Sequence, residues 1–108
     1  MKSLNLITLN NDKGEVIREA GTDRELNTLT LIMALFNNVK YRSRDEQRRA
    51  DKIYIKLEEL LKINDLQEFE LEDAEFELVQ SYVREFEPYL TGRTFLPFLD
   101  ELDKANHA

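Results

Sequence analysis

The sequence predicts a single α+β domain that is mostly helical, in which an N-terminal β-hairpin packs on three to four helices. Two short apolar runs near the N-terminus flank turn-forming residues, and the rest of the chain repeats apolar side chains at helical spacing. A chain of 108 residues suffices for one hydrophobic core, since separate cores need about 50 residues each. We expect the hairpin within residues 1–20, a helical part over 22–104 and a frayed tail at 105–108.

The hairpin is predicted from two extended runs and the turn between them. One run holds Leu4, Leu6, Ile7 and Leu9, and the other holds Val16 and Ile17. Residues 10–14 read Asn-Asn-Asp-Lys-Gly, and Asn, Asp and Gly adopt the positive φ angles of tight turns at low cost. Because a lone two-stranded ribbon is marginal in water, we expect it to pack against the helices.

A first helix is predicted to start at Thr22, because Thr22 and Glu25 have the spacing of a capping box. From Leu26 to Phe36 apolar side chains recur at helical spacing, and in the second half they surround the helix almost completely. Such a helix is either central or part of an interface, which makes it a candidate seam for a homodimer. A buried strand over 28–36 is the alternative.

A second helix is predicted after Asn37-Asn38, because Ser43 and Glu46 repeat the capping-box spacing. At about 100° per residue, its basic side chains gather opposite an apolar arc. That arc holds Ala50, Ile53, Tyr54, Leu57, Leu60 and Leu61.

Two further helices are expected in the C-terminal half. The third runs from about Glu72 to Glu87 and is bounded by Pro88. Its inward side chains are Phe76, Val79, Tyr82, Val83 and Phe86. Thr94 is expected to cap a short last helix with Pro97 in its first turn, and the chain is expected to fray from Lys104.

The net charge of −7 is unevenly spread along the chain. Residues 40–62 hold eight basic and five acidic side chains, a net +3, whereas residues 63–108 hold three basic and twelve acidic ones, a net −9. The overall field repels phosphate and so disfavours nonspecific attraction to nucleic acid or anionic lipid. The chain has no cysteine and no apolar run near 18 residues, so we expect a cytoplasmic protein with no membrane segment.

Few residues suit catalysis or metal binding. The one histidine, His107, lies next to the C-terminus, where a preorganised base or ligand is hard to build. The acidic run Glu72, Asp73, Glu75 and Glu77 is what the N-terminus of a helix favours. Glycine-rich phosphate loops and nucleophile elbows are missing from the sequence. We therefore expect no enzyme activity, with no catalytic residue, no metal and no cofactor.

The basic arc of the second helix is the candidate partner-binding surface. It holds Arg44, Arg48, Arg49, Lys52 and Lys56, with Tyr41 just before it. We expect a non-enzymatic protein that binds another macromolecule, first of all a protein. The alternative is a nucleic-acid-binding module, because basic side chains on successive turns can follow a phosphate backbone and Tyr41 can stack on a base. Outward charge also serves solubility alone, and the basic and acidic helices can pair within one chain or between chains.

Several short segments follow one another in a characteristic order. They are the leucine-rich segment ending at Phe36, Ile53-Tyr54-x-x-Leu57, Phe69-x-Leu71 with Ala74 and Leu78-Val79, Tyr89 followed by Gly92-Arg93, and a closing Leu99-x-x-Leu102. In this order the chain resembles a group of small proteins from tailed phages and prophages. The resemblance implies a phage-encoded factor that acts in the host cytoplasm by binding host or phage proteins. It points to no functional residue.

Overall fold

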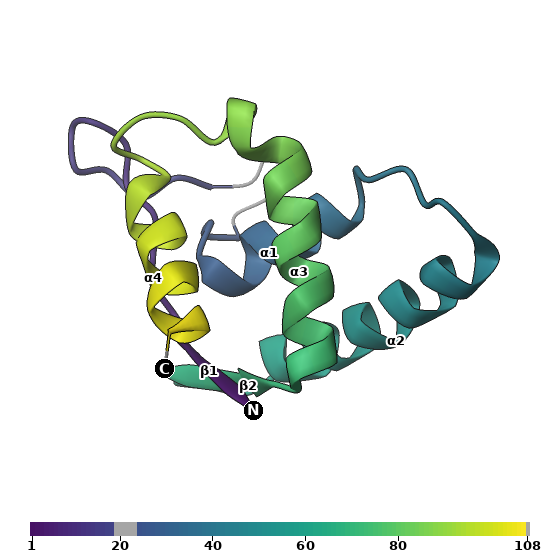
Figure 1. Ribbon diagram of the computed structural model, residues 1–108. Helices are drawn as coiled ribbons and strands as arrows, with labels where there is room; N and C mark the ends of the chain where they lie inside the picture. Colours follow the sequence, from purple (N-terminus) through teal and green to yellow (C-terminus); the bar gives the residue numbers. More distant parts are fainter. Residues whose placement is uncertain (19–23, 108) are drawn as a thin grey trace.

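The computed structural model describes residues 1–18 and 24–107, which form a mostly helical α+β fold (Figure 1). The order of elements is β1 (Lys2–Asn5), α1 (Thr28–Phe36), α2 (Arg44–Leu61), β2 (Glu68–Leu71), α3 (Asp73–Phe86), the 3-10 helix η1 (Glu87–Tyr89) and α4 (Leu96–Asn106). The predicted fold class is confirmed. The buried apolar side chains form one hydrophobic core to which all four α-helices contribute.

The two strands pair antiparallel, with Leu4 opposite Phe69 and Lys2 opposite Leu71. Leu4, Phe69 and Leu71 are buried, while the residues that alternate with them on β2 are exposed, as expected for a sheet with one face on the core. The N-terminal strand therefore has its antiparallel partner, but that partner comes from β2 and not from residues 16–17. Residues 68–71 alternate polar and apolar side chains, which is the pattern of a half-buried strand, so the signal for β2 was available in the sequence.

The predicted turn between the two N-terminal runs is present. Asn10 bridges Val16, and the side-chain Oδ1 of Asn11 accepts hydrogen bonds from the backbone N–H groups of Lys13 (2.9 Å) and Glu15 (3.0 Å). Gly14 has a φ of +81°, a value that glycine adopts without strain. The chain thus reverses at the place that the sequence indicates.

Leu9, Ile17 and Leu26 close a ring of three backbone hydrogen bonds. Leu9 donates to Leu26 (2.9 Å), Leu26 donates to Ile17 (2.7 Å) and Ile17 donates to Leu9 (3.0 Å). Each segment therefore satisfies the backbone of the next, and residues around Leu26 stay extended. The apolar run after Val16 is part of this three-way arrangement rather than a regular strand.

Helix α1 starts later than predicted. Its N-cap is Asn27, whose side chain accepts from the N–H of Thr30 (3.0 Å), while Thr30 Oγ1 accepts from the N–H of Asn27 (2.8 Å). Residues 22 and 23 of the predicted capping box lie outside the described residues. Glu25 and Leu26 are extended, so the prediction that they belong to the helix is wrong. The ring of backbone hydrogen bonds at Leu26 overrides the local helix signal.

Helix α1 lies at the centre of the molecule, behind α3 in Figure 1, and packs on α2 and α3. Residues 28–36 are helical, so the alternative of a buried strand is wrong, and the burial of eight of the nine residues places the helix in the core. Thr28 Oγ1 ties it to the N-terminal segment, because this oxygen accepts from the N–H of Ile7 (2.9 Å) and donates to the carbonyl of Asn5 (3.0 Å). The apolar surplus of α1 is thus covered within one chain.

Helices α2 and α3 agree closely with prediction. Ser43 caps α2, since its Oγ accepts from the N–H of Glu46 at 3.1 Å. In a complete capping box the Glu46 carboxylate would accept from the N–H of Ser43. Here it accepts from the N–H of Arg42 (3.1 Å), and Glu46 is buried. In α3 the predicted inward side chains are buried, apart from the half-buried Phe86.

Helix α4 differs from prediction at both ends. Phe95 occupies its N-cap position and Pro97 lies in its first turn, so Thr94 is not the cap. The helix continues to Asn106 and Ala105 is buried, which makes the frayed tail predicted from Lys104 wrong up to Asn106. The carboxylate of the buried Glu101 accepts the N–H of Asn5 at 2.7 Å and holds α4 on β1. Within the described ranges, no helix combines the length and hydropathy needed to cross a bilayer.

Candidate functional site

Five of the six predicted partner-binding residues line two hollows that flank α2. Tyr41, Arg44 and Arg48 line one hollow, which we name the tyrosine pocket. Arg49 and Lys52 line the other, which lies between α2 and α3 and which we name the α2–α3 groove. The sixth residue, Lys56, pairs with Glu75 of α3 through a distance of 2.7 Å between Nζ and Oε1. The predicted basic arc of α2 therefore lies between two different surfaces.

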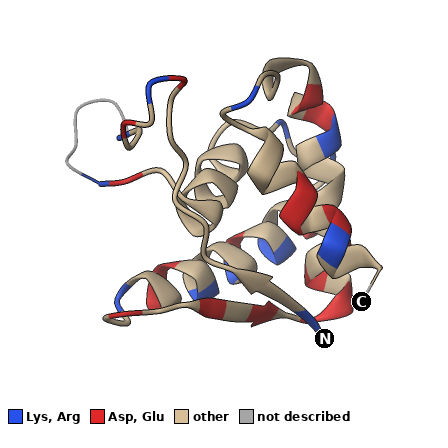
Figure 2. Ribbon diagram, turned by 90° about the vertical axis from the view of Figure 1, so that its left-hand side faces the viewer, with Lys and Arg blue, Asp and Glu red and all other residues tan. Residues whose placement is uncertain are grey.

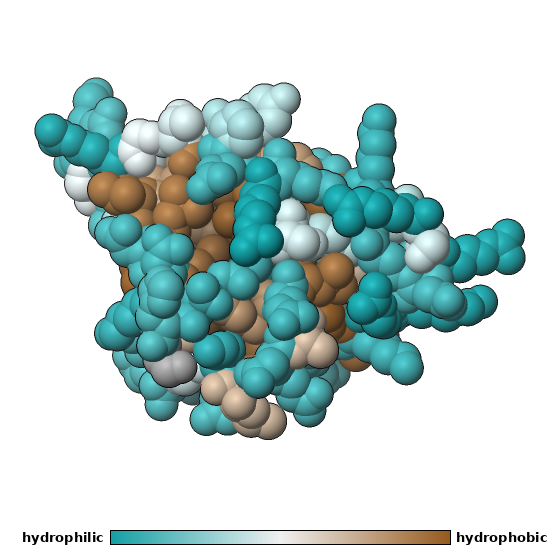
Figure 3. Space-filling model, viewed as in Figure 1, coloured by the Kyte–Doolittle hydropathy of each residue, from teal (hydrophilic) through white to brown (hydrophobic). Residues whose placement is uncertain are grey.

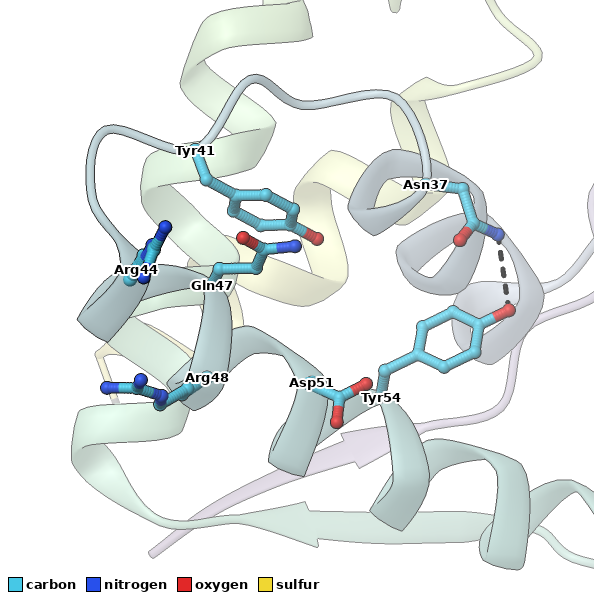
Figure 4. A pocket seen from close by; sticks show the side chains of 7 residues that line it. All are labelled: Asn37, Tyr41, Arg44, Gln47, Arg48, Asp51 and Tyr54. Carbon is cyan, nitrogen blue, oxygen red and sulfur yellow. Dashed lines mark hydrogen bonds between the residues drawn. The ribbon is translucent and has the colours of Figure 1, made fainter.

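The tyrosine pocket has a volume of about 490 Å³ and opens between the end of α1 and the first half of α2 (Figure 4). Five of its residues recur every three or four positions along α2, so they share one face of that helix. Asn37 follows α1, and Tyr41 comes from the linker before α2. The full lining is Asn37, Tyr41, Arg44, Gln47, Arg48, Asp51 and Tyr54.

Both tyrosine rings of the pocket are held by hydrogen bonds. Tyr41 Oη donates to the carbonyl of Phe36 (3.0 Å), and Tyr54 Oη accepts from Nδ2 of Asn37 (3.2 Å). Tyr41 also meets the ring of Tyr82 edge-on, with 6.3 Å between centroids. Burial, followed by the carboxylates of Asp51 and Glu46, raises the pKa of Tyr41, so this hydroxyl remains a donor at neutral pH. These hydrogen bonds hold the rings of Tyr41 and Tyr54 in place along the pocket.

Most of the polar side chains between the two tyrosine rings make no hydrogen bond or ion pair with the described residues. Those of Arg44, Gln47 and Asp51 make no hydrogen bond or ion pair with the rest of the described chain, while Arg48 pairs with Asp45 (3.2 Å) on the surface. Figure 4 shows the two arginines at one end of the pocket and Asp51 beside Tyr54 at the other. The pocket offers cationic donors at one end and a carboxylate acceptor at the other.

The α2–α3 groove is smaller, at about 180 Å³, and more apolar. Ile53 and Leu78 are buried at its base, and Ala74 is exposed on its α3 side. Arg49 and Lys52 stand at its rim, exposed and without an ion-pair partner among the described residues. Glu75 also lines the groove, and its carboxylate pairs with Lys56. The groove is therefore an apolar hollow with two exposed cations and one paired carboxylate at its edge.

Tyr82 was expected in the core, and the structure shows an unusual feature there. It is 2% exposed, and its hydroxyl is buried without any hydrogen-bond partner among the described residues. Its ring packs edge-on against Phe36, with 5.0 Å between centroids. Burial, with the carboxylate of Glu46 second, raises the pKa of Tyr82 to about 12. This hydroxyl is a local cost to stability beside the tyrosine pocket.

The basic and acidic segments pair partly within one chain. Besides Lys56 with Glu75, the guanidinium of Arg42 lies 3.0 Å from Oε1 of Glu85 on α3. Figure 2 shows acidic residues along β2 and both signs of charge on α2. Arg42 and Lys56 therefore form the ion pairs between the basic segment and α3. Arg44, Arg49 and Lys52 form no ion pair with the described residues.

The carboxylates considered for catalysis serve α3 itself. Oε1 of Glu75 accepts from the N–H of Glu72 (2.8 Å), a reach back to the N-cap. His107 stands at the C-cap of α4. In residues 1–18 and 24–107, no group of three or more His, Cys, Asp or Glu side chains is arranged to hold a metal ion.

Exposed apolar side chains are scattered over the described surface. On the face in Figure 3, hydrophilic side chains cover most of the surface and leave hydrophobic ones in the hollows between them. The large exposed apolar residues belong to several elements and linkers: Met1, Val16, Tyr41, Ile55, Ile63, Tyr89 and Leu96. Of these, Tyr41 alone lines the tyrosine pocket.

Comparison of the chain with protein-family models, curated proteins and solved structures found no match.

Proposed function

We propose that this chain acts by binding another protein, without catalysis, through the tyrosine pocket and the adjoining outer face of α2. The observation that carries the proposal is the combination of two fixed tyrosine rings with Arg44 and Arg48 in one pocket. Tyrosine and arginine are enriched among the residues that carry most of the affinity of protein interfaces, because each buries a large area and keeps polar groups for hydrogen bonds. Rings that are already fixed lose little entropy on binding.

The charge of the surface favours an acidic partner segment. Among the residues that the structure describes, Arg44 has no hydrogen-bond or ion-pair partner, and Arg48 has only an exposed pair with Asp45, which contributes little. An acidic segment gains two cationic contacts there and is steered to them at low salt. The resemblance to small phage proteins adds host and phage proteins in the cytoplasm as the first partners to test.

Nucleic-acid binding is the second candidate, and the exposed ring of Tyr41 beside Arg44 favours it, since bases stack on such rings. The net charge of −7 and the carboxylate of Asp51 inside the pocket oppose a phosphate backbone. A protein partner with a few carboxylates meets less of this repulsion.

The test is affinity capture from a lysate of the source cells, followed by affinity measurement with the purified partner. We expect Arg44→Glu/Arg48→Glu to weaken binding by about tenfold or more, since both sites then repel an acidic segment. The matched control is Lys13→Glu/Lys104→Glu, which makes the same change in charge at exposed sites away from the pocket. It should bind within about twofold of the unmodified protein.

Two results contradict the proposal. One is equal weakening by both double variants, because the effect would then follow net charge and not the pocket. The other is tight oligonucleotide binding near physiological salt, with a steep salt dependence that Arg44→Glu/Arg48→Glu abolishes.

A further inference from the structure

The α2–α3 groove combines an apolar base with two exposed cations at its rim, Arg49 and Lys52. Ile53 and Leu78, buried at 5% and 9% exposure, form its base, and the exposed methyl group of Ala74 flanks it. Its volume of about 180 Å³ is below the roughly 300–1,000 Å³ of sites for drug-sized ligands. The groove therefore suits a single aliphatic side chain.

The two cations at the rim of the groove, Arg49 and Lys52, can pair with carboxylates of a partner. Lys56, one turn beyond Lys52, is held by Glu75, and this ion pair joins the two helices beside the groove. Arg49 and Lys52 have no such partner among the described residues. A chain with twelve acidic side chains after residue 62 nevertheless leaves these two cations exposed around an apolar hollow.

We propose that the α2–α3 groove anchors one aliphatic side chain of a short acidic segment of the partner protein, with the flanking carboxylates on Arg49 and Lys52. This inference rests on the proposed function and adds the chemistry of the partner. Apolar anchors seated in pockets and ringed by polar contacts give protein interfaces much of their affinity. Complementary charge at the rim fixes the register of the segment.

A different protein fits this description better than a second copy of the chain. The copy's acidic strand β2 has its own apolar side chains, Phe69 and Leu71, buried in the core, so they cannot enter another groove. Two copies of a chain with net charge −7 also repel each other.

Two synthetic peptides test the inference: one of glutamates with a single central leucine, and its counterpart with serine in place of leucine. Their affinities and sites are read from amide chemical shifts of the labelled protein, which report millimolar binding. We expect the leucine peptide to bind about tenfold more tightly, because burial of one such side chain is worth about a factor of ten. The amides of Ile53, Ala74 and Leu78 should shift with leucine only.

Variants assign the effect to the groove. Ala74→Trp fills the hollow from an exposed position and should remove the advantage of leucine, whereas Ala74→Ser should keep it. Arg49→Glu/Lys52→Glu should weaken both peptides and leave the ratio between them unchanged. Thermal unfolding of each variant confirms that it is folded.

The outcomes separate this inference from the proposed function. Equal binding of both peptides at the basic face of α2, or leucine-dependent shifts elsewhere, overturns the inference and leaves the proposed function standing. A leucine advantage that is unchanged in Arg44→Glu/Arg48→Glu supports the groove, whatever the tyrosine pocket binds. No binding of either peptide at millimolar concentration also overturns the inference, whereas the proposed function is tested separately with the captured partner. Concentration-dependent shifts at Ala74 without peptide would assign the groove to a second copy and overturn the inference.

Discussion

Nζ of Lys56 lies 2.7 Å from Oε1 of Glu75, and the same oxygen accepts the N–H of Glu72 at 2.8 Å. One carboxylate oxygen therefore joins α2 to α3 and also caps the first turn of α3. Lys56 and Glu75 are partly buried, with side chains 35% and 20% exposed, so water screens this pair less than the surface pairs. Glu75 also lines the α2–α3 groove, so the pair lies at the edge of that groove.

Substitution of Glu75 should separate its two roles. Glu75→Gln keeps an oxygen that can accept from Glu72 but loses the ion pair, and we expect it to lower the free energy of unfolding by about 1 kcal/mol. Glu75→Ala loses both contacts and should cost about 2 kcal/mol. Urea unfolding measures both. The control Glu59→Gln breaks the exposed pair with Lys62 and should cost less than about 0.5 kcal/mol. Equal costs for Gln and Ala would mean that the cap contributes nothing.

Removal of the Tyr82 hydroxyl should not destabilise the protein. This oxygen is buried with no hydrogen-bond partner in the described chain, so Tyr82→Phe removes an unsatisfied polar group and keeps the ring against Phe36. We expect the free energy of unfolding to stay equal or to rise by up to about 1 kcal/mol. Tyr41→Phe is the control, because it loses a bond to the Phe36 carbonyl and should cost about 1 kcal/mol. A cost above 1 kcal/mol for Tyr82→Phe would show that the hydroxyl has a partner.

Stability should fall in alkaline solution because of Tyr82. Its pKa is raised to about 12 in the folded state from an ordinary value of 10.0, so the folded state binds the proton more tightly than the unfolded state. The stability that this proton provides is complete below pH 10 and is lost as pH rises through about 12. One such group gives a slope of at most about 1.4 kcal/mol per pH unit. Urea unfolding across this range should show a shallower decline in Tyr82→Phe, and identical slopes would exclude Tyr82 as a contributor.

Thr28 should be intolerant of an isosteric change. Its Oγ1 accepts from the N–H of Ile7 and donates to the carbonyl of Asn5, and the side chain is fully buried. Thr28→Val keeps the shape and leaves both backbone groups unpaired, so we expect a loss of about 2 kcal/mol in urea unfolding. Thr94→Val, at a half-buried position whose side chain makes no hydrogen bond to the described residues, should change stability by less than about 0.5 kcal/mol. Similar costs at the two positions would contradict the bridging role of Thr28.

Local signals in the sequence predict α2 and α3 well, since Ser43 caps α2 and the inward positions of α3 follow helical spacing. The start of α1 could not be predicted in this way. Leu26 fits a helical pattern, but hydrogen bonds to Leu9 and Ile17, far away in sequence, hold it extended. The pairing of β1 with β2 is equally non-local, and its register depends on the helices that lie between the strands.

Part of the lining of the tyrosine pocket could be predicted from the sequence. Tyr41, Arg44 and Arg48 do line one pocket, but Asn37 and Tyr54 were assigned only structural roles. The spacing of Arg44, Gln47, Asp51 and Tyr54 places them on one helical face, a signal available in the sequence. That Lys56 turns to Glu75 while Lys52 does not depends on how α2 crosses α3, which no local pattern specifies.

Photo-crosslinking from Gln47 tests the central claim most directly. Gln47 lines the tyrosine pocket with a side chain that makes no hydrogen bond to the described residues, so a benzoylphenylalanine placed there reports what enters the pocket. The same group at Lys104, exposed on α4, is the control. We predict one discrete protein adduct from position 47 in the source cells, lost in Arg44→Glu/Arg48→Glu and missing from position 104. A nucleic-acid adduct at position 47, or the same adducts from both positions, would contradict the account.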